Sequence, residues 1–154
     1  MKKTLLMASL FLALTVSVLN AQDYRTGAGV RLGYDSGITL KHFISPVSAL
    51  EGIMSVSPNY FHLTGLYEYH QPVPDMANLN WYLGLGGHLG SLYKKGDRRG
   101  DFLLGADAIA GLEYVFPSVP FSVSLDWKPS FNFTTDYNEG WFYSFGLSLR
   151  YTFR

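Results

Sequence analysis

The sequence from Trp141 to Phe153 reads WFYSFGLSLRYTF, and this stretch decides the fold. Apolar or aromatic residues alternate along it with residues that are mostly small or polar. Successive side chains of a β-strand point to opposite faces, so alternation with a period of two predicts a strand. One face of this strand is apolar or aromatic throughout, and its residues are Trp141, Tyr143, Phe145, Leu147, Leu149, Tyr151 and Phe153.

Seven further segments show the same alternation, separated by turns rich in Gly, Pro, Asn, Asp and Ser. Eight antiparallel strands can close with both chain ends on one side, and eight is the smallest size among bacterial outer-membrane barrels. The expected fold class is therefore all-β, an eight-stranded antiparallel up-and-down transmembrane β-barrel. The expected strands are Tyr24–Tyr34, Ile38–Ile44, Ala49–Val56, Tyr60–His70, Leu79–Tyr93, Phe102–Phe116, Pro120–Phe133 and Trp141–Phe153.

Composition supports a barrel that faces an apolar medium and excludes several other classes of protein. Charged residues make up 16% of the 154 residues, against about 25% in average proteins, and aromatic residues make up another 16%. The absence of cysteine excludes disulfide scaffolds, cysteine-ligated zinc sites and thiol catalysis. A formal net charge of zero argues against nucleic acid as a partner.

The first 21 residues are expected to be a cleaved signal peptide. Lys2 and Lys3 form a basic start, an apolar run follows over Leu5–Leu19, and Ala21 offers a small residue for cleavage. The run is shorter than the roughly 20 residues of a membrane-spanning helix. We therefore expect a signal peptide at 1–21 and an outer-membrane barrel at 22–154.

The apolar faces of the expected strands are predicted to point outward, towards lipid. Charge-dense stretches fall in connections, whereas glycines and single charges share the other face of each strand. Aromatic residues gather near strand ends, as in the girdles of lipid-embedded barrels. A soluble periplasmic barrel of lipocalin type, with the apolar face inside, is the alternative.

Ten charged residues fall at strand positions that the alternation assigns to the inward face. Because lone buried charges are costly, and eight strands leave a lumen that side chains can fill, we expect a closed, salt-bridged interior. Inward glycines would make room for these larger side chains. A small transport barrel is the alternative. The expected interior residues are Arg25, Arg31, Lys41, Lys128 and Arg150 as bases, and Glu51, Glu68, Asp107, Glu113 and Asp126 as acids.

No motif predicts catalysis, a metal or a cofactor. The glycine-rich stretch Gly84–Gly90 lacks the following helix that a nucleotide-binding loop needs. Ser144 and Ser148 face inward, but no histidine pairs with them in an obvious triad, so a lipid-modifying enzyme remains only an alternative. The charged loop Lys94–Asp101 could contact lipopolysaccharide phosphates if it faces the cell exterior.

The signal peptide, the eight alternating segments and the terminal Tyr151-Thr152-Phe153 resemble the small outer-membrane β-barrels of OmpA and OmpX type. In that family a terminal aromatic pattern is recognised by the barrel assembly machinery, although here Arg154 follows the phenylalanine. Segments such as Leu63–His70 and Leu125–Pro129 also resemble short uncharacterised barrels of Bacteroidetes. The resemblance implies outer-membrane lipid, lipopolysaccharide and the assembly machinery as partners, an unknown envelope protein as a further one, and no catalytic residues.

Overall fold

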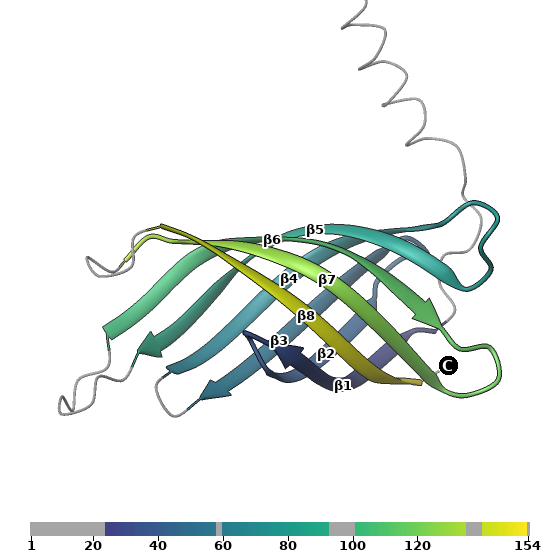
Figure 1. Cartoon of the computed structure of the whole chain (residues 1–154), viewed down its shortest axis with the longest axis horizontal. Helices are drawn as coiled ribbons and strands as arrows, with labels where there is room; N and C mark the ends of the chain where they lie inside the picture. The colour runs from purple at the N-terminus through teal and green to yellow at the C-terminus, as the bar shows by residue number, and fades with distance from the viewer. Residues whose placement is uncertain (1–23, 58–59, 93–100, 135–139, 154) are drawn as a thin grey trace, which may run out of the picture.

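The computed structural model describes residues 24–57, 60–92, 101–134 and 140–153, which form one closed antiparallel barrel (Figure 1). Each strand pairs with its neighbours in sequence, and β1 closes the barrel against β8. The expected all-β, eight-stranded antiparallel barrel is confirmed. The strands are β1 (Thr26–Gly33), β2 (Gly37–Phe43), β3 (Ser48–Ser57), β4 (Tyr60–Pro72), β5 (Leu79–Leu92), β6 (Asp101–Val115), β7 (Phe121–Asn132) and β8 (Gly140–Phe153).

Strand boundaries lie within two residues of those expected from the alternating pattern. β7 runs through Pro129, which lies opposite Tyr143 of β8. On the other side of β7, the ladder with β6 skips Ala108 and Ile109. Proline has no backbone N–H to donate, so the interruption is confined to one ladder.

The two ends of the barrel differ in what they contain. We call one end of the barrel the terminal end, because β1 starts and β8 ends there. It also holds the connections at 44–47, 73–78 and 116–120. We call the opposite end the hairpin end, after the tight turn at 34–36 that joins β1 to β2; the remaining connections also belong to this end. The expected signal peptide and Lys94–Gly100 of the charged loop lie outside the described residues, whereas Asp101 opens β6.

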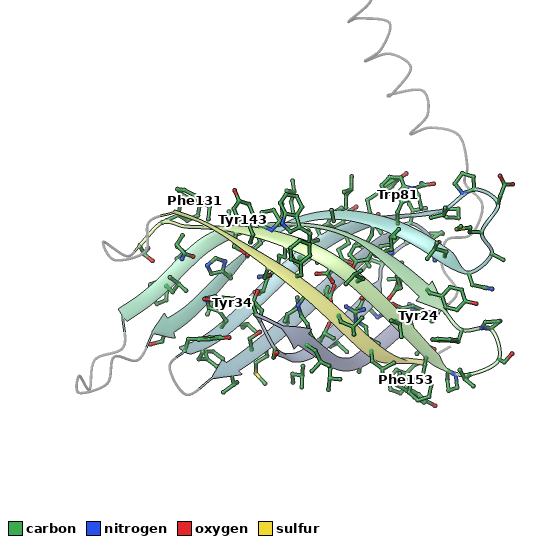
Figure 2. All side chains as sticks on the ribbon, viewed as in Figure 1. Tyr24, Tyr34, Trp81, Phe131, Tyr143 and Phe153 are labelled. Atoms are coloured by element: carbon green, nitrogen blue, oxygen red, sulfur yellow. The ribbon has the colours of Figure 1, made fainter. Side chains whose placement is uncertain are left out.

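The barrel is apolar outside and polar inside. Leu85 and Phe145, for example, are 70% and 68% exposed on the outer face, whereas Lys41, Glu68 and Arg150 are fully buried. Figure 2 shows labelled aromatic side chains towards both ends, with Phe131 and Tyr143 near one end and Trp81 and Phe153 near the other. No helix in the described part of the chain is long and apolar enough to span a membrane.

The alternation fails at the start of β1, which corrects one expected interior residue. Arg25 is exposed, and the neighbouring Tyr24 is buried in its place. Tyr24 packs edge-on against Phe43 with ring centroids 5.2 Å apart, in a small apolar cluster with Ala49 and Val115. An aromatic ring gains more from burial than an unpaired guanidinium, so the chain turns Tyr24 over the terminal end and leaves Arg25 in solvent.

Candidate functional site: the charged interior of the barrel

The described residues form three groups of ion pairs in the barrel interior, and these groups follow one another along β8. Arg150 belongs to the first group, Gly146 lies beside the second, and Ser144 belongs to the third. We call them the terminal, middle and hairpin networks. Because inward-facing strand positions recur every second residue, each group receives side chains from several strands.

The terminal network joins two cations to three carboxylates. Arg150 contacts Glu51, and its guanidinium lies 3.4 Å from Glu113. The Lys41 ammonium lies 2.8 Å from Glu68 and 3.4 Å from Glu51. All five side chains are essentially inaccessible to solvent, so their mutual contacts replace the water that they lose on folding.

Neutral groups complete the terminal network. The Tyr24 hydroxyl donates a hydrogen bond of 2.9 Å to Glu113, and Arg150 donates one of 2.8 Å to Ser124. Burial and the neighbouring Glu113 carboxylate raise the pKa of Tyr24 well above its usual value. Tyr24 therefore stays a neutral donor and closes the terminal end of the interior.

The middle network is a single arginine–aspartate pair. Arg31 donates two hydrogen bonds of 2.8 and 2.6 Å to the two carboxylate oxygens of Asp126, and the Tyr82 hydroxyl adds a third of 3.0 Å. Such forked contacts are among the strongest ion pairs in proteins because both partners are planar. The Tyr82 ring also lies 4.2 Å from the Lys41 ammonium, which links this network to the terminal one.

The hairpin network centres on Lys128. Its ammonium lies 2.9 Å from Asp35 and 3.4 Å from Asp107. Asp107 also accepts a hydrogen bond from Ser130, and its second oxygen lies 2.8 Å from Nδ1 of His88. The other ring nitrogen of His88 lies 2.7 Å from the amide oxygen of Asn132.

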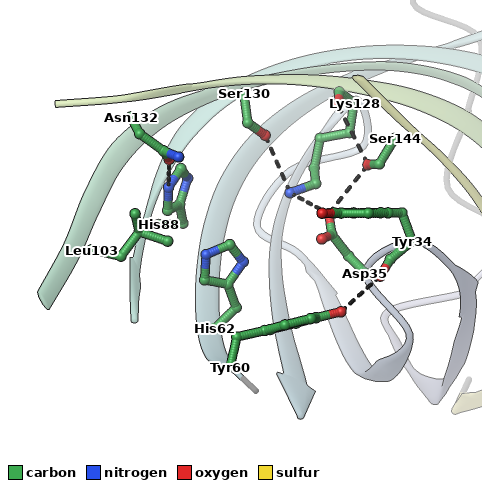
Figure 3. Close-up of a pocket in the computed structure, with 10 residues that line it drawn as sticks. All are labelled: Tyr34, Asp35, Tyr60, His62, His88, Leu103, Lys128, Ser130, Asn132 and Ser144. Carbon is green, nitrogen blue, oxygen red and sulfur yellow. Dashed lines mark hydrogen bonds and ion pairs between the residues drawn. The ribbon is translucent and has the colours of Figure 1, made fainter. Parts of the chain in front are cut away.

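A small cavity lies beside the hairpin network (Figure 3). Its volume is about 60 Å³, room for only a few water molecules. The His62 ring lies 4.8 Å from the His88 ring between centroids, and neither nitrogen of His62 has a hydrogen-bond partner among the described residues. The cavity is lined by Tyr34, Asp35, Tyr60, His62, His88, Leu103, Lys128, Ser130, Asn132 and Ser144.

Asp35 makes the hairpin network sensitive to acid. Burial alone would raise the pKa of Asp35, but the Lys128 ammonium and the Ser144 hydroxyl outweigh burial and hold the pKa below its usual value. A lowered folded-state pKa adds stability above the unfolded value of about 3.9, and this stability is lost as pH falls through the folded pKa.

We therefore expect Asp35→Asn to cost about 1.5–3 kcal/mol of unfolding free energy at pH 7, the usual contribution of a hydrogen bond to a charged group. The difference from the unmodified chain should shrink as the pH is lowered below 4. Urea unfolding in detergent at a series of pH values measures it. A difference that stays constant down to pH 2 would show that Asp35 is not the titrating group.

Inward glycines make room for the charged side chains, as the sequence indicated. A Cβ atom on Gly146 would collide with the guanidinium of Arg31, and one on Gly111 would collide with the Tyr82 ring. By contrast, a Cβ on the outward-facing Gly65 would meet no atom within 4 Å.

Gly146→Ala is therefore expected to lower the free energy of unfolding by about 1–3 kcal/mol, because it overpacks a guanidinium already fixed on Asp126. Gly65→Ala makes the same chemical change on the open outer face and should alter stability by less than about 0.5 kcal/mol. Urea midpoints of the two variants in one detergent test this, and equal midpoints would contradict the packing.

The structure brings together nine of the ten residues expected in the interior: Arg31, Lys41, Glu51, Glu68, Asp107, Glu113, Asp126, Lys128 and Arg150. Arg25 is the exception. Asp35 was missed because the sequence Asp35-Ser36-Gly37 reads as a turn. The signal that could have found it is the alternation itself, since Asp35 continues the odd-numbered inward positions of β1.

The arrangement of serine and histidine does not resemble a nucleophilic site. Asp107 lies between Ser130 and His88, whereas a catalytic triad needs the histidine between the serine and the carboxylate. Ser144 likewise donates directly to Asp35, at 3.2 Å. Across the part of the chain that the structure describes, no serine hydroxyl is hydrogen-bonded to a histidine, and no cluster of three metal-binding side chains occurs.

Comparison with known proteins relates the chain to two solved barrels. It is similar in structure to the N-terminal β-barrel domain of Pseudomonas aeruginosa OprF, with a TM-score of 0.58 at 14% identity, covering 82% of this chain and 95% of that one. It is also similar to Neisserial surface protein A, with a TM-score of 0.54 at 13% identity, covering 83% and 93%. These likenesses show the barrel fold. No protein-family model and no curated protein sequence matches the chain.

Proposed function

We propose that the chain is an integral outer-membrane protein whose barrel crosses the bilayer with a closed interior and has a structural or interaction role in the envelope. The inside-out polarity of the barrel is the observation that supports this most. Outward side chains such as Leu85, Leu125 and Phe145 are more than half exposed, while ten charged side chains among the described residues are buried inside. Water would favour the opposite arrangement, whereas lipid favours this one.

Closure of the barrel also suits a bilayer. In hydrocarbon no water is available to satisfy backbone N–H and C=O groups, so spanning structures must pair these groups internally. The β1–β8 ladder, from the Thr26–Phe153 pair to the Gly33–Gly146 pair, removes the free edges that an open sheet would expose. Exposed aromatic side chains near both ends suit the headgroup level, where tyrosine and tryptophan are enriched.

Membrane insertion can be tested by fractionation and gel migration. The folded protein should appear in the outer-membrane fraction and should migrate differently on a gel before and after heating. Recovery from the osmotic-shock supernatant would instead favour a soluble periplasmic barrel of lipocalin type. A mass shift of lipid A on overexpression would favour a lipid-modifying enzyme.

The filled interior favours a closed barrel over a transport path. Side chains as large as Arg31, Tyr82 and Arg150 are buried within the lumen, and both arginines are paired with carboxylates. We expect no reproducible single-channel conductance when the protein is inserted into planar lipid bilayers. A steady unitary conductance that disappears in a variant of the lumen would establish a pore instead.

The proposed location also suggests partners. The apolar outer face would contact outer-membrane lipid, and loops at the hairpin end would meet lipopolysaccharide if the terminal end is periplasmic. The exposed row Leu149, Tyr151 and Phe153 on β8 suits recognition by the barrel assembly machinery. Crosslinking in intact cells followed by purification would identify an envelope protein partner. The resemblance to barrels of Bacteroidetes stays a prediction.

A further inference from the structure

A row of glycines crosses the outer face of the barrel. Gly52, Gly65 and Gly87 are successive partners in the register of β3, β4 and β5, and they occupy outward positions of these strands. A Cβ atom on Gly52 or Gly65 would meet no atom within 4 Å, so the wall is open above them. Glycine weakens the interior of a strand and often marks a place where a ligand approaches the backbone closely.

Large apolar side chains on both sides turn the glycine row into a groove, which we call the glycine groove. The Tyr67 hydroxyl lies 2.9 Å from that of Ser48, and this hydrogen bond holds the Tyr67 ring in the wall of the groove. The groove therefore exists before any ligand binds. The flanking row towards the terminal end is Leu50, Tyr67 and Leu85, and the row towards the hairpin end is Met54, Leu63 and Leu89.

The glycine groove ends at β2 beside polar side chains, which an apolar outer wall does not need. Leu40 and His42 line this end. His42 Nδ1 lies 2.8 Å from the hydroxyl of Thr26, and the other ring nitrogen has no hydrogen-bond partner in the described part of the chain. Arg25 is exposed directly before Thr26, and its carbonyl accepts a hydrogen bond from the N–H of Phe43, so it neighbours both members of the pair.

The polar end of the groove lies near the terminal end of the barrel, and its apolar part reaches the middle of the wall. His42 precedes the last residue of β2, whereas Leu85 lies well inside β5, which starts at Leu79. The strands run obliquely to the barrel axis (Figure 1), so a groove that crosses them climbs from one end of the barrel towards its middle. An amphiphilic lipid has the same order, a polar head at the surface and an apolar tail below it.

We propose that the glycine groove holds one acyl chain of a phospholipid, and that Arg25, Thr26 and His42 bind the phosphate of the same lipid. Charge complementarity supports the second part, because a guanidinium and further hydrogen-bond donors suit an anionic phosphate. The inference rests on the proposed membrane location and adds to it a lipid site on one part of the wall.

The width of the glycine groove favours an acyl chain over a helix of another protein. The two flanking rows are four residues apart along each strand, about 13 Å between Cα atoms, and their side chains narrow the gap. An α-helix with its side chains is about 10–12 Å across, so it would rest on the rims without reaching the glycines. A hydrocarbon chain has no side chains and can lie on the glycine floor.

Native mass spectrometry of the full chain in a nonionic detergent tests the groove, with phosphatidylglycerol as the probe. We expect the unmodified chain to bind one phosphatidylglycerol saturably. Gly65→Leu fills the floor of the groove and should weaken this binding by about tenfold or more. The matched control is Ala110→Leu, which adds an outward leucine on β6 beyond the groove and should leave the affinity unchanged.

A diacylglycerol with the same acyl chains but no phosphate tests the polar end. The unmodified chain should bind phosphatidylglycerol about tenfold more tightly than diacylglycerol, the step expected of one hydrogen bond to a charged group. Arg25→Ala and His42→Leu should each lower this ratio towards one. Because Arg25 lies outside the groove, Arg25→Ala should leave the affinity for diacylglycerol unchanged.

Equal phosphatidylglycerol affinities of the unmodified chain and Gly65→Leu would overturn the proposal, as would equal affinities of the unmodified chain for the two lipids. A mass of two chains that Gly65→Leu reduces to one would show that the groove holds a second copy instead. If Gly65→Leu does not fold, Gly52→Leu on β3 takes its place. A chain that fractionates with the outer membrane but binds no lipid would refute the site and leave the proposed function unaffected.

Discussion

Arg150→Ala is expected to lower the free energy of unfolding by about 3–5 kcal/mol, the usual cost of removing one partner from a buried ion pair. Arg150 is fully buried and contacts both Glu51 and Glu113. Without it, Lys41 alone would face three buried carboxylates. The loss should appear as a large shift in the urea midpoint of the protein in detergent.

Arg25→Ala is the matched control. Arg25 was expected inside the barrel on the same grounds as Arg150, but it is exposed and lies just before β1. Its removal should change stability by less than about 0.5 kcal/mol. Arg98→Ala, in the expected loop, should be equally mild. Equal midpoints for the Arg150 and Arg25 variants would contradict the placement of both residues.

Asp126→Leu is expected to lower the free energy of unfolding by a comparable amount, about 3–5 kcal/mol. The reason is that Asp126 is the carboxylate with which the buried Arg31 forms its ion pair. The change would leave a buried guanidinium without its fork of two hydrogen bonds. It would also remove the acceptor of the Tyr82 hydroxyl. Urea unfolding in the same detergent measures the loss.

The double variant Arg31→Met, Asp126→Leu separates the contribution of the ion pair to stability from the contribution of side-chain packing. Replacing both members of a buried ion pair by apolar groups is often neutral or stabilising, so the double variant should regain most of the stability that Asp126→Leu loses. The coupling energy follows from the four unfolding free energies of a double-mutant cycle. A double variant no more stable than Asp126→Leu would show that the Arg31–Asp126 contact does not determine the loss.

The local pattern of the sequence predicted the fold almost completely. Each strand of a barrel repeats apolar and small or polar residues with a period of two, and the β8 segment shows this over its whole length. Turn residues then set the strand count at eight. The third and fourth segments also form strands where expected, although their inward faces carry the apolar Ile53 and Leu66 among the charges.

The interior was predicted only as a set of residues, not as a set of contacts. Alternation along a strand assigns a side chain to one face of the sheet. It does not say which residue of a strand far away in sequence that side chain will contact. Arg31 meets Asp126 across 95 residues, and Arg150 meets Glu51 across 99. These pairs depend on the register of all the strands around the closed barrel.

Phase also failed where the strand ladder ends. Tyr24 and Arg25 exchange the faces that alternation assigns them, because the chain before β1 can turn the ring over the open end. Asp35 does lie in the turn between β1 and β2, as expected, but it also continues the inward positions of β1, so its carboxylate reaches Lys128.

The sequence by itself therefore determined the strands, their number and the face on which the charged residues within the strands lie, since these depend on neighbours along the chain. Only the tertiary structure decided which charges meet. It also placed His70 beside Glu68 and His88 beside Asp107. The reason is physical: ion pairing and burial depend on distances across the closed barrel, and strand register sets those distances.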